Sequence, residues 1–394
     1  MPWQEVSVVS LRAEFVALAN QDRANVRALC RQFQISPPTA YKWLARFARD
    51  GPAGLVDHSR RPHHSPTRTS AEVEANVIAL RDAHPTWGGR KVSARLEHRG
   101  QVAPQPSTVT EILRRHGRLA SAERVPHAWR RFEREVPNQL WQMDFKGHVA
   151  LAQGHGRVHP LTVLDDHSRY AIGLEACADE RGATIQARLR ELFRRYGLPD
   201  QMLMDNGGAW GRTSAMQAYT PFSVWLLRLG IRVSHGRPYH PQTQGKDERF
   251  HRTLKAEVLQ GPPFDSLARA QQVFDDWRTS YNLERPHEAC GLQPPISRYW
   301  TSQRTFPEVL PPIAYSSDDQ VRRVQKQGDI SFLGRHIQVG LPFRGQLVAV
   351  RPTRIDGVHE VYFVCQQLRQ IDLRLPPSVV ETEDDCVNHI PAHP

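Results

Sequence analysis

The chain has 394 residues, of which 52 are Lys or Arg and 41 are Asp or Glu, so its formal net charge is +11. This length predicts two to four domains, and a hydrophobic content of 39% predicts several modest cores. The five cysteines are far apart and form no CxxC pair, which argues against a zinc finger or a disulfide scaffold. No apolar run reaches membrane-spanning length and the N-terminus lacks a signal-peptide pattern, so we expect a cytoplasmic protein without membrane contact.

The positive charge is concentrated at the front of the chain. Residues 1–136 hold 22 basic and 13 acidic residues, whereas the remainder is nearly balanced, with 30 and 28. A basic N-terminal third predicts a polyanionic partner, with DNA or RNA ahead of a membrane surface. The alternative is a basic surface that only keeps the protein soluble.

Residues 1–58 predict a helix-turn-helix domain. A helix at 26–33 is followed by Ser36, a good N-cap, and by Pro37, which suits the first helical position of the next helix. The second helix of such a motif can enter a major groove, although an ordinary helical hairpin is the alternative. Its inner face would carry Ala40, Trp43, Leu44 and Phe47, and its outward residues, the candidate DNA contacts, would be Thr39, Tyr41, Lys42 and Arg46.

A basic linker at 59–69 leads to a second helix-turn-helix domain at 70–118. Ser70 is expected to cap its first helix, and Ser107 to cap its last. Two linked DNA-binding modules gain effective concentration, which suits a protein that holds one long site. The expected helices include 91–98 and 108–115, and a second basic linker follows at 119–137.

Residues 138–300 predict an α/β domain. Residues 141–151 alternate as a strand, which places Asp144 in mid-strand, where a carboxylate is disfavoured. A short apolar run ends directly before Asp205 and a glycine turn. Open α/β sheets place their sites at such strand ends. Further strands are expected at 159–165, 170–177, 201–204 and 231–234, with helices at 184–196, 219–229 and 266–281.

The stretch 237–258 begins as a Pro- and Gly-rich loop and becomes a helix at Lys246. One face of this helix is apolar, and the opposite face carries one carboxylate, Glu248, followed by two cations. An amphipathic surface helix with an internal ion pair would explain this stretch on its own. The apolar residues are Phe250, Leu254 and Val258, and the cations are Arg252 and Lys255.

Residues 320–378 predict a small β-barrel of five short strands. Its role could be DNA contact, protein contact or packing. The tail at 379–394 is acidic and is expected to be disordered.

Three carboxylates, Asp144, Asp205 and Glu248, therefore lie on separate elements of one α/β domain. Hard divalent cations such as Mg²⁺ bind through a few carboxylates plus substrate phosphate, and two ions about 4 Å apart can clamp a displacement at phosphorus. The alternative for each acid is a solvated surface group.

The motifs of this domain resemble a known family. Trp141-Gln-Met-Asp144, Asp205-Asn-Gly207 and His240-Pro-Gln-Thr-Gln-Gly-Lys-Asp-Glu-Arg249 are similar to the three signatures of the retroviral-integrase-like DDE transposases, and among these to bacterial insertion-sequence transposases. The segments Tyr281-Asn282, Arg285-Pro286-His287 and Trp87-Gly88 also match the group.

This resemblance implies a ribonuclease-H-like catalytic core, a mixed sheet with flanking helices. It implies that Asp144, Asp205 and Glu248 are the catalytic and metal-binding triad for two Mg²⁺ or Mn²⁺ ions, and that Arg252 and Lys255 contact the element's end DNA. Glu248 follows Asp205 by 43 positions, longer than the commonest spacing, so an insertion is expected at 209–222. Asp247 would project about 100° away from Glu248 around the helix, so the metal is assigned to Glu248.

The implied function is a DNA transposase that cleaves the 3′ ends of a mobile element and joins them to target DNA. The expected partners are double-stranded DNA and further copies of this chain, in a cytoplasmic, nucleoid-associated assembly without a small-molecule substrate. Two alternatives stay open: a catalytically inactive DNA-binding regulator, and a metal-dependent nuclease that does not join strands.

Overall fold

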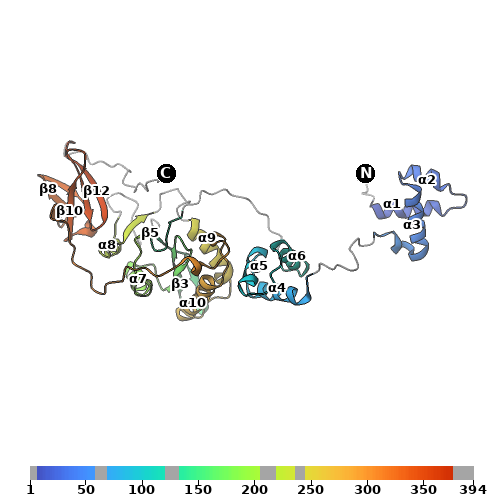
Figure 1. Cartoon of the computed structure of the whole chain (residues 1–394), viewed down its shortest axis with the longest axis horizontal. Coiled ribbons are helices and arrows are strands. Elements are labelled where there is room, and N and C mark those ends of the chain that lie inside the picture. Colours follow the sequence, from blue (N-terminus) through green and yellow to red (C-terminus); the bar gives the residue numbers. More distant parts are fainter. Residues whose placement is uncertain (1–6, 58–68, 120–132, 205–218, 236–244, 376–394) are drawn as a thin grey trace. The chain divides into compact units, whose positions relative to one another are not determined.

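The computed structural model describes residues 7–57, 69–119, 133–204, 219–235 and 245–375 (Figure 1). The chain divides into two compact units, Met1–Arg68 and Thr69–Pro394. Among the described residues, none of the helices combines the length and the apolar character needed to cross a membrane.

The first unit consists of three α-helices and a short 3₁₀ turn around one core. The Ser36 hydroxyl accepts a hydrogen bond from the Thr39 backbone N–H at 3.4 Å, and Pro37 takes the first helical position, so the predicted cap is confirmed. The predicted inner face of the last helix is also confirmed. The elements are α1 (Val8–Ala19), α2 (Val26–Gln32), α3 (Pro37–Asp50) and η1 (Gly51–Leu55).

The second unit begins with another helical trio, here called the second helix-turn-helix domain (residues 69–119). Ser70 caps its first helix as predicted. The prediction for Ser107 is wrong, because the last helix starts two residues earlier than predicted, at Pro106, with Gln105 in the N-cap position. Proline suits the first helical position, where its missing N–H costs no hydrogen bond. The helices are α4 (Ala71–Ala83), α5 (Gly89–His98) and α6 (Pro106–Arg115).

A mixed sheet forms the centre of the second unit. Strands β1 (Trp141–Phe145), β3 (Arg157–Asp165) and β4 (Ala171–Cys177) pair antiparallel, with β3 in the middle. Strands β5 (Gln201–Met204) and β6 (Arg232–His235) extend the sheet from β1 in parallel. The predicted mixed sheet of a ribonuclease-H-like core, with three antiparallel strands extended by two parallel ones, is thereby confirmed.

The predicted strand at 141–151 is wrong in one respect, because it breaks into β1 and the short β2 (Val149–Ala150). Gly147 adopts φ +81° at the break, a conformation that side chains disfavour. Asp144 nevertheless stays in β1, on the face opposite Trp141 and Met143.

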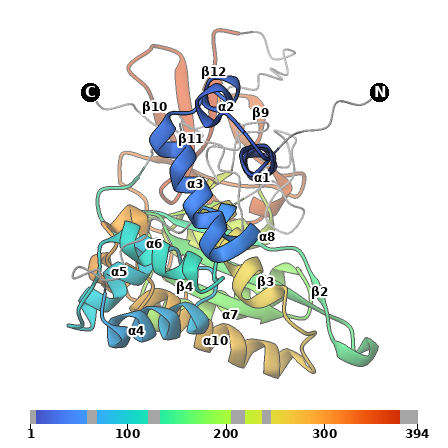
Figure 2. The same cartoon turned by 90° about the vertical axis from the view of Figure 1, so that its right-hand side faces the viewer.

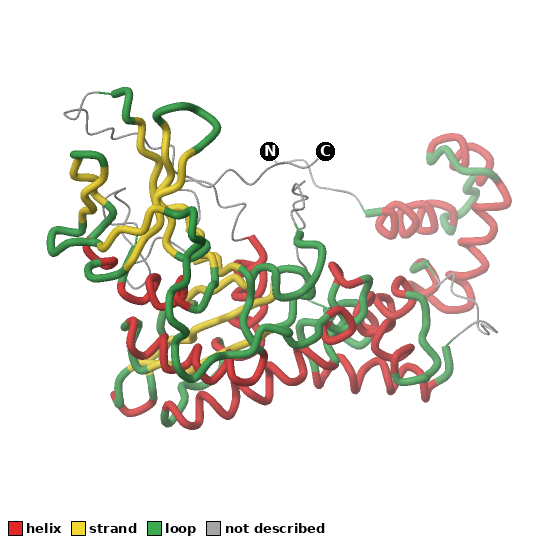
Figure 3. Tube along the Cα trace, turned by 60° about the vertical axis from the view of Figure 1, so that its left-hand side comes forward, coloured by secondary structure: helices red, strands yellow, loops and turns green. Residues whose placement is uncertain are grey.

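Helices cover both faces of this sheet (Figures 2 and 3). The face that carries Trp141 and Met143 shares one apolar core with α7 (Gly182–Tyr196) and α8 (Pro221–Arg228). Gly173 permits the close approach of α7, since a Cβ there would lie 2.5 Å from Leu192 Cδ1. The other face packs against α9 (Gly245–Leu254), its π-helical continuation η5 (Lys255–Leu259) and α10 (Leu267–Leu283).

The C-terminal region is confirmed as β, but its described part contains six strands where a barrel of five was predicted. These strands pair antiparallel, as a four-stranded sheet and a hairpin. Its core is continuous with that around α8. Phe343 contacts Tyr219, which lies just before α8, with ring centroids 5.1 Å apart. Along β6, the Val233 N–H donates to Gln366 Oε1 at 3.4 Å. Of the three roles left open, packing is therefore observed. The strands are β7 (Gln320–Arg323), β8 (Asp329–Phe332), β9 (Arg335–Gln338), β10 (Leu347–Pro352), β11 (Val358–Phe363) and β12 (Gln366–Asp372).

Candidate active site and DNA-binding surfaces

Asp144 occupies a partly open position on β1, with its side chain 24% exposed. Thr162 lies opposite it on β3, and the Thr162 hydroxyl donates to the Asp144 carbonyl oxygen at 2.9 Å. His251 of α9 contacts both residues: its Nε2 is 2.8 Å from Thr162 Oγ1 and its Nδ1 is 3.8 Å from Asp144 Oδ2. The strand pair and α9 thus meet at Asp144.

The protonation of His251 follows from these contacts. Because the Thr162 hydroxyl donates to Asp144, its oxygen accepts from His251, which assigns the proton of the neutral ring to Nε2. Burial, together with the charge of Lys146, lowers the pKa of His251 to about 3. The ring is therefore neutral at physiological pH, with the Nδ1 lone pair on the side of Asp144.

A buried ion pair fixes the start of α9 to the sheet. Asp166 is fully buried and pairs with Lys246 Nζ. It also accepts hydrogen bonds from Gln142 Nε2 at 2.7 Å and from the Arg134 backbone N–H at 2.8 Å. Gln142 lies two residues before Asp144 on the same face of β1. The Asp166 carboxylate therefore sets the position of α9 relative to Asp144.

The first turn of α9 carries two adjacent acids with different surroundings. Asp247 is only 2% exposed, whereas Glu248 is exposed. Burial, and then the charges of Asp144 and Asp166, raise the pKa of Asp247 well above its usual range. Asp247 therefore lies in the electrostatic reach of Asp144, while Glu248 faces solvent at the same helix start.

Asp205 falls outside the described residues. Strand β5 is described to Met204, which pairs with Met143 of β1, the residue before Asp144. The expected insertion at 209–222 also lies largely outside the described residues. Among the residues that are described, no three His, Cys, Asp or Glu side chains form a ready metal-binding group.

The described carboxylates fit a cation nonetheless. Within the described structure, Asp247 Oδ1 is buried and has no hydrogen-bond partner. An uncompensated buried oxygen is costly, and neighbouring carboxylates repel each other unless protons or a metal compensate. Oxygen donors of this kind are those that Mg²⁺ and Mn²⁺ take.

The predicted apolar stripe holds α9 in place. Phe250 is buried and packs edge-on against Tyr281 of α10, with ring centroids 5.0 Å apart, and Leu254 is fully buried. Asn282, also on α10, bonds both the N–H and the carbonyl of Ala171 on β4. Val258 is only half-buried, because it lies in the π-turn η5 rather than in a continuous α-helix.

The candidate DNA contacts differ in exposure. Arg252 and Lys255 are exposed beyond the start of α9, and Tyr41 and Lys42 are exposed on α3. Thr39 and Arg46 are half-buried. The Thr39 hydroxyl lies 2.9 Å from Ser36 Oγ, and the Arg46 guanidinium lies over the Trp43 ring, 5.1 Å from its centroid.

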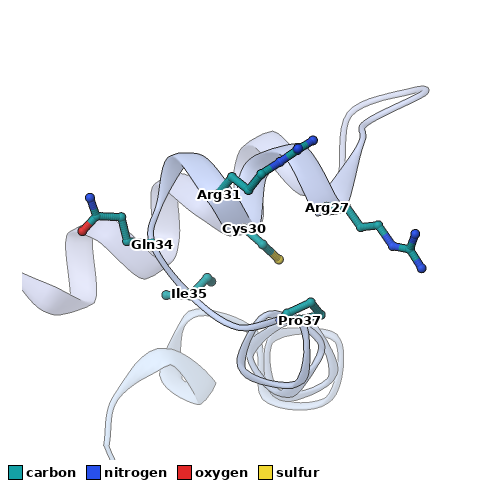
Figure 4. A pocket seen from close by; sticks show the side chains of 6 residues that line it. All are labelled: Arg27, Cys30, Arg31, Gln34, Ile35 and Pro37. Atoms are coloured by element: carbon teal, nitrogen blue, oxygen red, sulfur yellow. The ribbon is translucent and has the colours of Figure 1, made fainter.

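A shallow hollow lies beside α3 in the first unit (Figure 4). Arg27 and Arg31 extend away from α2, while Cys30 points toward Pro37 at the start of α3. Two arginines next to a candidate recognition helix suit phosphate contacts.

Four residues were not predicted from the sequence to take part in the site: Asp166, Lys246, Asp247 and His251. The sequence did contain one indication of Asp166. Two adjacent acids, Asp165 and Asp166, lie at the end of an apolar strand, and α/β sheets often place their functional sites at strand ends. The role of Lys246 was not visible, since its partner is 80 residues away.

Family comparisons agree with this architecture. Two integrase core domain models match residues 134–241 and 229–295, and an IS481 family transposase C-terminal domain model matches 319–376. A helix-turn-helix domain model matches 11–63, and a homeodomain-like domain model matches 39–113.

Relatives of this chain are encoded by bacterial insertion elements. The chain is 28% identical over 259 residues to an uncharacterized protein of IS476 from Xanthomonas euvesicatoria, covering 64% of this chain and 72% of the relative. It is 27% identical over 250 residues to an uncharacterized protein of IS407 from Burkholderia multivorans, covering 61% and 86%.

Solved structures with some likeness include two integrase catalytic core domains. The BIV core has 22% identity and a TM-score of 0.30, covering 41% of this chain and 92% of its own. The HTLV-2 core, solved with magnesium, has 18% identity and a TM-score of 0.31, covering 42% and 97%. The chain thus matches helix-turn-helix models in front, integrase core domain models in the middle and an IS481 family transposase C-terminal domain model at the end, and it is similar to proteins of bacterial insertion elements.

Proposed function

We propose that this chain cleaves the ends of a mobile DNA element and joins them to target DNA, with Asp144, Asp205 and Glu248 as the catalytic carboxylates. The observation that carries the proposal is the meeting of Asp144 with the start of α9, where buried Asp247 Oδ1 has no hydrogen-bond partner among the described residues. Carboxylates brought together in this way, with one buried oxygen of Asp247 left without a hydrogen bond, are typical of the surroundings of a cation-dependent site.

The reaction consists of two displacements at phosphorus. In the first, water attacks the phosphodiester at the element's end, the bond to the 3′-oxygen breaks, and that oxygen leaves as a hydroxyl. In the second, this 3′-hydroxyl attacks a target phosphodiester and displaces the target's own 3′-oxygen. Neither step forms a bond to the protein, so the chain's contribution is positioning and charge.

The metal ligands are proposed to be Asp144, Asp205 and Glu248, with two Mg²⁺ or Mn²⁺ ions. When bound, the ions would activate the attacking oxygen and stabilise the leaving one. The chain itself holds the ligand-bearing elements in register. The Lys246–Asp166 pair fixes α9 beside β1, and neutral His251 presents Nδ1 to Asp144 without adding a positive charge.

DNA is proposed to follow the exposed cations. Lys42 and Tyr41 on α3 would contact the element end, with Thr39 and Arg46 as further candidates at the same helix. Arg252 and Lys255 would contact phosphates next to the active site. Because two element ends must be processed together, the working form would be a homo-multimer on DNA.

The test is an incubation of the purified chain with Mg²⁺ or Mn²⁺, labelled duplexes carrying the DNA that flanks its coding region, and a target plasmid. The matched variants are Asp205→Asn and, as a control carboxylate remote from the site, Asp318→Asn. We expect joined products from the wild type and the control, and none from Asp205→Asn. Cleavage without joining would instead support a nuclease, and binding without either step would support a regulator.

A further inference from the structure

One partly buried carboxylate joins the second helix-turn-helix domain to the catalytic core. Glu257, in the π-turn η5, is 15% exposed in its side chain and pairs with the Arg285 guanidinium. It also accepts hydrogen bonds from the Thr86 hydroxyl and from Trp277 Nε1, the latter at 2.8 Å. Thr86 lies just before α5, whereas the other two donors belong to the core. The same carboxylate is therefore shared by both domains.

Two ion pairs extend this contact along α5. Arg95 Nη2 lies 2.6 Å from Glu284 Oε2, and Arg90 Nη2 lies 3.0 Å from Glu288 Oε1. The second oxygen of Glu288 accepts from Arg249 Nη2 at 2.7 Å, and Arg249 is the neighbour of Glu248 on α9. In both pairs α5 supplies the cation and the core supplies the acid, so the two surfaces are complementary in charge.

The contact also accounts for two sequence segments that the active site leaves unexplained. Trp87 is 1% exposed, and the Arg285 guanidinium lies 5.9 Å from its ring centroid. Burial by itself raises the pKa of Glu257, but Arg285 and the hydrogen bonds from Thr86 and Trp277 lower it, and the net pKa is below its usual range. The Trp87-Gly88 and Arg285-Pro286-His287 segments thus meet at one joint.

The joint leaves the last helix of the domain available for DNA. Ser107, Thr108 and Arg114 on α6 are exposed, and the contacts to the core come from α5 and the residues before it. In a helix-turn-helix domain the later helix enters the major groove. DNA binding through α6 and docking through α5 are therefore compatible.

We propose that the second helix-turn-helix domain is clamped to the catalytic core at Glu257, Glu284 and Glu288, so that a DNA end bound by α6 is held at a fixed distance from α9. The part of this proposal that concerns DNA rests on the function proposed above. The clamp itself is a property of the free protein. Cleavage at one defined position would then follow from the rigidity of this joint.

The clamp is tested first without DNA, by hydrogen–deuterium exchange of the full chain. The variants are Arg95→Glu, Glu284→Arg and the double charge exchange, with Arg194→Glu as control because Arg194 forms an inter-element pair with Glu308 elsewhere in the core. We expect exchange in peptides of α5 and of residues 284–290 to rise roughly tenfold or more in each single variant and to recover in the double variant. Unchanged exchange in the single variants, or a double variant no better than either, would overturn the clamp.

The coupling is tested second, by hydroxyl-radical footprinting in EDTA on a duplex carrying the flanking DNA. Without free Mg²⁺ or Mn²⁺ the proposed cleavage is prevented, so this readout does not depend on catalysis. We expect one continuous footprint for the wild type and the double variant, and loss of the part nearest the DNA end in the single variants. An unchanged footprint in the single variants would overturn the coupling. A wild type that binds and docks but never cuts would refute the proposed activity and leave the clamp standing.

Discussion

Buried Asp247 and partly buried Glu257 are two acids at opposite ends of one helical segment, and their surroundings are opposite. Within the described structure, Asp247 Oδ1 has no hydrogen-bond partner and the pKa of Asp247 is raised by burial and by the neighbouring Asp144 and Asp166 charges. Glu257 is satisfied by three donors, and its pKa is lowered despite its burial. An acid whose oxygens are satisfied by donors behaves as a structural joint, whereas Asp247 adds negative charge beside Asp144, which favours a cation at the neighbouring proposed ligands.

The largest expected effect is on strand joining, and it distinguishes Glu248 from its neighbour Asp247. We expect Glu248→Gln to reduce strand joining by on the order of a thousandfold, since it removes a proposed metal ligand. Asp247→Asn should reduce joining far less, because Asn keeps the shape of a side chain assigned no ligand role. Both variants are compared in the joining assay, with circular dichroism as the folding control. The reverse order of effects would transfer the ligand role to Asp247.

The next largest effect concerns Lys246, which pairs with Asp166 at the start of α9. Lys246→Met leaves Asp166 buried without its cation, and breaking such a pair should cost about 3 kcal/mol of unfolding free energy. Urea denaturation measures the loss, and exposed Lys326→Met is the matched control. If Lys246→Met were as stable as the control, the pair would not hold α9 to the sheet.

A smaller effect on the free energy of unfolding is expected at Glu257, in η5. Glu257→Gln removes the charge that pairs with Arg285 and should lower the unfolding free energy by about 2 kcal/mol. Asp247→Asn should leave stability unchanged or raise it, because it removes a repelled carboxyl group. The two variants are measured side by side by urea denaturation without metal. Equal destabilisation by both would contradict the contrast between the two acids.

The smallest expected effect is a pH dependence of the free energy of unfolding. It comes from His287, two residues after Arg285, the partner of Glu257. Burial, and then the charges of Arg169 and Arg249, lower the pKa of His287 to about 3. Its imidazole Nδ1 accepts from the Ala289 backbone N–H at 3.2 Å, which requires the neutral ring. As pH falls below about 6.5, the unfolded chain takes up this proton first, so stability is complete above pH 6.5 and is lost toward pH 3.

We therefore expect His287 to account for about 1 kcal/mol of the stability lost between pH 7 and pH 5.5. His287→Gln should flatten that part of the curve, and exposed His155→Gln should not. Unfolding free energies at a series of pH values provide the measurement. An unchanged slope in His287→Gln would show that its ring is not held neutral.

The helices and strands were predicted from the sequence more accurately than the burial of individual side chains. Strand β5 begins and ends where it was predicted, and Asp144 lies in a strand as expected. The apolar stripe of α9 is confirmed for Phe250 and Leu254. These features depend on local periodicity, which the chain shows directly.

What stayed hidden depends on partners far along the chain. Gln142 is a polar residue on the face of β1 that also carries Asp144, yet it is 1% exposed, and its side-chain amide donates to the buried Asp166. The π-turn that directs Glu257 toward Thr86 and Arg285 has no periodic signature of its own. Part of the basic charge of the N-terminal third likewise binds glutamates of the core rather than only DNA, as the Arg95–Glu284 pair shows.

The contact between β6 and the C-terminal strands has a consequence for handling the protein. Strand β6 pairs with β5 on one side, and on the described chain its Val233 N–H is met by Gln366 of the C-terminal region. An uncovered sheet edge offers a row of backbone donors and acceptors to any passing strand, which promotes self-association. A chain shortened after the catalytic core should therefore precipitate more readily than the full-length protein, however intact its active site.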